Sequence, residues 1–181
     1  MTSADPASGR PAVGLGRAVV VPLAVVALAS ALWLISDRLL YIGPLDRATF
    51  AWVVVIPIWA AAPLVAGFAW RGLSARARTL AAATCALVIG AIVGALLWQD
   101  VAFPACPTGP ARGPLEWLLP ATVVGVVIGG GFGVNCLIAS AQLRAGQPKR
   151  ALTYGAFGQV AVVASAAVLS FVLFIGVCQR P

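Results

Sequence analysis

This sequence has no histidine and very little charge. Lys, Arg, Asp and Glu together make up 9% of its 181 residues, against about 25% in ordinary soluble domains. Its cysteines lie at positions 85, 106, 136 and 178, with no CxxC pair and no spacing typical of a zinc or haem site. No acidic residue lies in the centre of an apolar run, where it could act as a general base. We therefore expect a non-enzymatic protein without metal or cofactor.

A net charge of +7 is compatible with nucleic-acid binding, but the pattern of the basic residues is not. They occur in short groups between long apolar runs, whereas a nucleic-acid interface concentrates them on one soluble face. We read these groups as membrane topology signals and expect no nucleic-acid partner.

What the chain has in abundance is apolar sequence. Hydrophobic residues make up 61% of it, and its mean hydropathy is +1.00. A helix needs about 20 apolar residues to cross a bilayer, and five runs approach or exceed that length: 18–41, 47–70, 79–99, 115–143 and 152–177. They are too long and too evenly apolar for barrel strands. The sequence predicts an all-α polytopic membrane protein, with a flexible tail (1–16) before a single five-helix transmembrane domain (17–181).

Loop charges predict the orientation, because Lys and Arg concentrate on the cytoplasmic side. An inside N-terminus puts eight of the 12 basic residues in the cytoplasm: Arg10, Arg17, Arg71, Arg76, Arg78, Arg144, Lys149 and Arg150. The tryptophans agree, with Trp70 near the inner interface and four others near the outer one: Trp33, Trp52, Trp98 and Trp117. We expect an N-in/C-out, multi-pass protein of the cell (inner) membrane. The bias towards alanine, valine and arginine, with little lysine, is typical of a bacterial source.

Two Asp-Arg dipeptides flank the first predicted outer turn. Asp37 and Arg38 precede the helix stop Gly43-Pro44, and Asp46 and Arg47 follow it, with Asp46 placed as an N-cap. They predict ion pairs that close a helix hairpin. The alternative is a polar mouth that attracts a charged solute.

Glycines predict close packing of the third and fourth spans. Gly125, Gly129 and Gly133 recur every fourth residue in the fourth span, and Gly90 and Gly94 do so in the third. The glycine triplet Gly129, Gly130 and Gly131 has an alternative interpretation, in which the helix unwinds and exposes backbone groups to a solute.

The second span contains Pro57 and Pro63, with Trp59 between them. Each proline removes a backbone hydrogen bond and favours a bend. The room beside a bent helix is either filled by a neighbouring helix or forms a ligand groove with Trp59 as its wall.

Asn135 is the amide placed deepest in the predicted spans, whereas Gln99, Gln142 and Gln159 are expected near an interface. Asn135 is predicted to hydrogen-bond across helices or to line a polar path.

The cysteines separate by predicted side of the membrane. Cys106 and Cys178 both fall on the outer side, where a disulfide between them would be stable. Cys85 and Cys136 fall toward the inner ends of their spans, where free thiols behave as small apolar residues.

These observations favour a subunit, assembly factor or stabilising factor of a larger membrane complex, bound to membrane lipids and to a membrane-protein partner or a second copy of itself. The alternative is a small permease or channel-like module for a neutral or apolar solute. Its path would use Asn135, Trp59, the glycine triplet and a mouth formed by Asp37 and Arg47.

Overall fold

The structure is a computed structural model that describes residues 11–38, 49–98 and 114–178, and throughout these ranges the regular structure is helical, with no strand. The elements, in chain order, are helix α1 (Pro11–Arg38), the π-helical segment η1 (Ala51–Val55), α3 (Ile56–Ala69), α4 (Ala75–Trp98), α5 (Pro114–Arg144) and α6 (Pro148–Cys178).

Four stretches of helix are long and apolar enough to cross a membrane: Gly14–Trp33, Ala75–Trp98, Leu115–Arg144 and Pro148–Val177. A fifth apolar stretch, Val53–Ala69, is shorter. The prediction of an all-helical chain with several membrane-capable helices is confirmed, and these helices indicate a membrane protein.

The first helix begins earlier than the sequence predicts. α1 starts at Pro11, so residues 11–16 of the expected tail are helical. Proline is well suited to the first helical position, since its fixed φ matches the helix and its missing N–H has no partner there. Leu15, in the next turn, packs against the core. Burial of the Leu15 side chain stabilises this first part of the helix, and the composition of the tail does not predict it.

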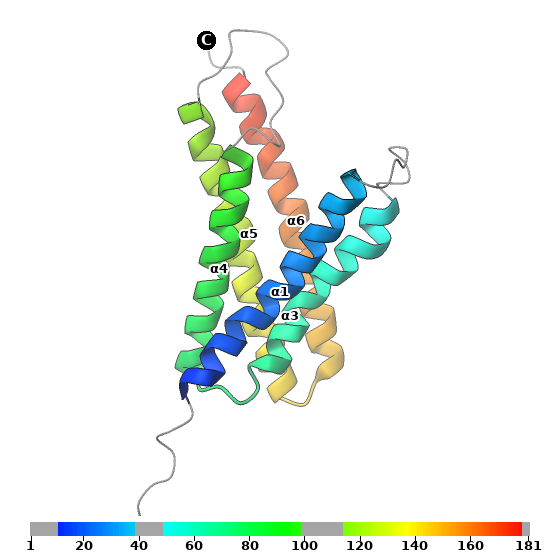
Figure 1. Cartoon of the computed structure of the whole chain (residues 1–181), viewed down its shortest axis with the longest axis vertical. Helices are drawn as coiled ribbons and strands as arrows, with labels where there is room; N and C mark the ends of the chain where they lie inside the picture. The colour runs from blue at the N-terminus through cyan, green and yellow to red at the C-terminus, as the bar shows by residue number, and fades with distance from the viewer. Residues whose placement is uncertain (1–10, 39–48, 99–113, 179–181) are drawn as a thin grey trace, which may run out of the picture.

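Two groups of helices form the bundle (Figure 1). α1 and α3 lie side by side and are inclined to α4, α5 and α6, which run nearly parallel to one another. α1 contacts α3 and α4, whereas α3 contacts α5 and α6. The two groups meet at one end and diverge toward the other.

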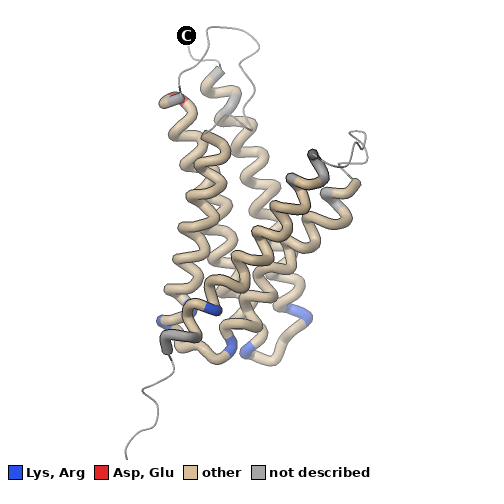
Figure 2. Tube along the Cα trace, viewed as in Figure 1, with Lys and Arg blue, Asp and Glu red and all other residues tan. Residues whose placement is uncertain are grey.

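The main hydrophobic core lies where the two groups meet. Its residues come from α1, the second half of α3, the first two-thirds of α4 and the second half of α5: Ala18, Ala62, Ala66, Trp70, Ala81, Ala82, Cys85, Ile89, Phe132 and Cys136. The α3–α4 and α5–α6 turns lie at this end, together with Arg17, Arg71, Arg76, Arg78, Arg144, Lys149 and Arg150, as Figure 2 shows. We call it the basic end.

The α5–α6 turn at the basic end is a Schellman motif. Gln147 N–H donates to the Gln142 carbonyl at 2.9 Å, and Gly146 N–H donates to the Leu143 carbonyl at 3.2 Å. Gly146 has a φ of +71°, which glycine adopts without steric cost. Pro148 then starts α6, so this short turn returns the chain directly into the next helix.

Candidate functional site

The α4–α5 interface is a direct contact between backbones. A Cβ atom added to Gly90 would lie 2.8 Å from the Gly125 carbonyl oxygen, and one added to Gly125 would lie 2.5 Å from the Gly90 carbonyl oxygen. A Cβ at Gly129 would collide with the Ala86 carbonyl and lie 2.8 Å from the Gly90 nitrogen. No side chain fits at these positions, so the predicted glycine packing of the third and fourth spans is confirmed.

The glycine triplet does not unwind the helix. α5 is continuous from Pro114 to Arg144, and the alternative prediction of a broken helix at residues 129–131 is wrong. The three glycines differ in role: Gly129 packs on α4, and Gly131 packs on the Val162 side chain of α6. Gly130 has nothing within 4 Å of an added Cβ. Close packing on two sides stabilises the helix against the low helix propensity of glycine.

A buried pair of amides joins α5 to α6. Asn135 Nδ2 donates to Gln159 Oε1 at 2.9 Å, and the two residues are 6% and 0% exposed. Gly158 makes room for the pair, because a Cβ there would lie 2.5 Å from Asn135 Oδ1. The predicted cross-helix bond of Asn135 is confirmed. The position expected for Gln159, near a membrane interface, stays a prediction. Gln159 Nε2 is buried without a partner among the described residues.

A second polar link joins α1 to the end of α3. Pro22 has no N–H, so the Ala18 carbonyl four residues earlier lacks its usual helical donor. Trp70 Nε1 donates to this oxygen at 2.7 Å, and Trp70 is 0% exposed. Trp70 lies next to Arg71 at the basic end, and its place near the inner interface stays a prediction, but its ring is buried and does not face lipid as a belt residue does. Trp117 is likewise buried, whereas Trp33 and Trp98 are exposed.

The two prolines of the second span have different effects. Pro57 lies in the first turn of α3, directly after the π-helical segment η1, whose last residue Val55 is itself helical (φ −70°, ψ −48°). Pro63 lies inside α3 and is fully buried. A Cβ added to Gly155 of α6 would lie 3.7 Å from Pro63 Cβ, so a neighbouring helix fills the space there. Trp59, between the prolines, is half-buried.

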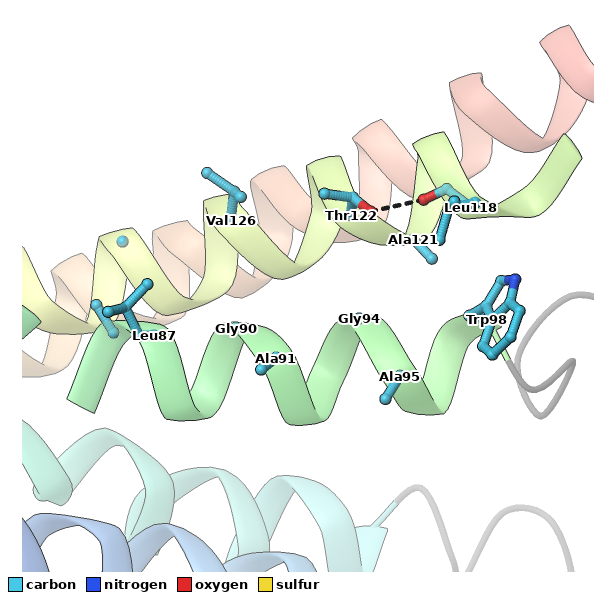
Figure 3. A pocket seen from close by; sticks show the side chains of 12 residues that line it. Leu87, Gly90, Ala91, Gly94, Ala95, Trp98, Leu118, Ala121, Thr122 and Val126 are labelled. Carbon is cyan, nitrogen blue, oxygen red and sulfur yellow. Dashed lines mark hydrogen bonds between the residues drawn. The ribbon is translucent and has the colours of Figure 1, made fainter. Parts of the chain in front are cut away.

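The exposed surface of the α4–α5 pair contains a groove that we did not predict from the sequence. It has a volume of about 440 Å³, and Figure 3 shows its lining: Ala86, Leu87, Gly90, Ala91, Gly94, Ala95 and Trp98 of α4, with Leu118, Ala121, Thr122, Val126 and Gly130 of α5. The Thr122 hydroxyl already donates to the Leu118 carbonyl at 2.7 Å. The Thr122 donor is therefore already used within α5, and the rest of the lining is apolar apart from Trp98 at one end.

Small residues form the floor of this groove, and Leu87 and Val126 are exposed along it. The sequence does carry a signal for it. Ala91 and Ala95 directly follow Gly90 and Gly94, so the small-residue surface of α4 extends beyond the strip that contacts α5.

The outer hairpin and the predicted disulfide cannot be compared with the structure. Asp46, Arg47 and Cys106 lie outside the described residues. For three further residues, Asp37, Arg38 and Cys178, the helical backbone is described but the side chain is not. Cys85 and Cys136 are free and buried in the core, as expected of small apolar residues. Within the described ranges, no group of three His, Cys, Asp or Glu side chains is arranged to hold a metal ion.

Comparison of the chain with protein-family models, with curated proteins and with solved structures finds no match.

Proposed function

We propose that this chain is a non-enzymatic multi-pass subunit of a larger membrane complex, and that a transmembrane helix of another protein packs into the α4–α5 groove. The observation that carries this proposal is the floor of that groove, where Gly94, Ala91 and Ala95 leave the backbone of α4 uncovered.

The physics of helix association in lipid favours such an occupant. Lipid tails are as apolar as leucine, so helices associate through close van der Waals packing, and small residues permit that approach. Most glycines of the α4–α5 interface are already used within the chain, whereas Ala91, Ala95 and Gly130 border open space. An apolar helix face suits a groove lined almost entirely by apolar side chains, whose Thr122 donor is already used within α5.

We also propose five spans with the N-terminus inside, in the inner membrane of a bacterium. η1 and α3 together would form the short second span, and Val53–Ala69 reaches the lower limit of about 17 residues for crossing. The seven basic residues of the basic end support a cytoplasmic location for it. Glu116, in the first turn of α5, lies at the opposite end (Figure 2).

One observation favours the second candidate function, a permease for a small solute. Gln159 Nε2 is a hydrogen-bond donor buried within the bundle that no described residue satisfies. Against a path there, Asn135 is 6% exposed and Gly129 and Gly131 are covered by neighbouring helices. The subunit proposal therefore has the stronger support.

Site-specific photo-crosslinking in native membranes tests the subunit proposal. A photoreactive residue at Val126, which is 67% exposed in the groove, should give one discrete protein adduct. The matched control is Val168 of α6, which is 65% exposed outside the groove and should give only lipid adducts. Lipid adducts alone at both positions would contradict a partner helix in the groove, and solute flux by the purified protein would then favour the permease.

A further inference from the structure

The basic end carries seven basic residues and, in the part of the chain that the structure describes, no acidic side chain. Six of its seven basic residues are exposed, and Arg78 is half-buried. Among the described side chains none at this end is acidic, since Glu116 is in the first turn of α5, at the opposite end of the bundle. The charge is therefore available to a negative partner outside the chain.

Exposed aromatic side chains lie just inside this ring of charge. The Arg71 guanidinium stacks 4.5 Å from the centroid of the Phe68 ring, and Phe68 is itself exposed. On α6, Tyr154 and Phe157 are exposed one and two turns beyond Arg150. Tyr is enriched in the headgroup region of a bilayer, and Phe next to basic residues is typical of helices that lie at the same boundary.

The α3–α4 and α5–α6 turns place their basic residues at the same height along the bundle. A Cβ added to Gly67 of α3 would lie 2.8 Å from Leu143 Cδ1, so the ends of α3 and α5 are packed together. Arg71 follows Gly67 by one turn, and Arg144 follows Leu143 directly. The α5–α6 turn then adds Lys149 and Arg150 beside a cleft of about 400 Å³, which is lined by residues 146–150.

The position of Arg150 beside this cleft is fixed by a hydrogen bond. Its Nη1 donates to Gln147 Oε1 at 3.0 Å, within the turn that the Schellman motif holds. The guanidinium has further N–H groups with which to bind a phosphate oxygen.

We propose that the basic end binds the headgroups of anionic phospholipids, with Arg71, Arg144, Lys149 and Arg150 as the principal ligands. Charge complementarity selects an anionic leaflet, and Phe68, Tyr154 and Phe157 place these cations at the depth of the phosphates. Selection of lipid needs no protein partner, so its failure would leave the subunit proposal untouched.

Lipid retention by the full-length protein tests this proposal. The protein is reconstituted into bilayers with equal parts of phosphatidylglycerol and phosphatidylcholine, and the lipids that remain bound after detergent extraction are counted by native mass spectrometry. The wild type should retain several-fold more phosphatidylglycerol. One basic residue near an anionic surface contributes at most about five-fold. Replacing the four ligands with glutamine leaves Arg17, Arg76 and Arg78 in place and should therefore reduce the preference for phosphatidylglycerol several-fold without abolishing it.

Two controls keep the test decisive. Lysine at Arg71, Arg144 and Arg150 preserves the charge and should preserve the preference for phosphatidylglycerol. If the glutamine variant does not fold, raised salt replaces it, because charge screening should reduce the preference of the wild type. Equal retention of both lipids by the wild type would overturn the proposal, as would a preference that neither neutralisation nor salt reduces. Phosphatidylglycerol binding abolished by free inorganic phosphate would show an anion site and overturn the assignment to a lipid leaflet.

Discussion

The Trp70 indole N–H hydrogen-bonds the Ala18 carbonyl, the oxygen that Pro22 deprives of its helical donor. The two residues are 52 positions apart, and both are buried. In a membrane an unsatisfied backbone carbonyl costs several kcal/mol, so a proline inside a helix requires a substitute donor. Trp70 supplies it and thereby fixes α1 against the end of α3.

Trp70→Phe should lower the free energy of unfolding by about 1–3 kcal/mol, since it leaves the Ala18 carbonyl buried without a donor. Reversible unfolding in detergent measures the change. Pro22→Ala restores a backbone N–H to the carbonyl, so the same Trp70 substitution should cost less in that background. An identical cost in both backgrounds would show that Trp70 contributes by packing alone.

Gly129 and Gly130 offer a matched pair of adjacent positions. Gly129→Ala should destabilise the protein by about 1–3 kcal/mol, because its methyl group would collide with the Ala86 backbone. Gly130→Ala meets nothing within 4 Å and should be neutral or stabilising by up to about 1 kcal/mol through helix propensity. Thermal unfolding of the two variants tests this directly. Equal effects would be inconsistent with the close approach of α4 and α5.

The Asn135–Gln159 pair should behave as one unit. Replacing either residue with leucine breaks the bond and leaves the other amide buried without its partner. Replacing both removes the buried polar atoms together. A double-mutant cycle should therefore give a coupling energy of about 0.6–1.7 kcal/mol. Strict additivity of the two substitutions would argue against the bond. Solute flux that Asn135→Leu abolishes without loss of folded protein would instead support a polar path.

Sequence reasoning found the features that depend on one helix at a time. Hydropathy located the long spans, and glycine spacing located the α4–α5 contact, because each signal is local and periodic. It did not predict that Gln159 and Trp70 are buried, because their burial depends on partners 24 and 52 residues away. We did not predict the groove for a related reason. Its lining comes from two helices, and which faces they expose depends on the contact between Gly90 and Gly125.

The most direct test of the subunit proposal is the native mass of the protein, extracted from its own membrane in polymer discs. The wild type should carry a second protein in fixed stoichiometry. Ala91→Leu, which fills the groove, should lose that partner, whereas Ala83→Leu, exposed on α4 outside the groove, should keep it. A wild type that appears only as the 18.4 kDa chain or whole multiples of it would contradict the proposed complex.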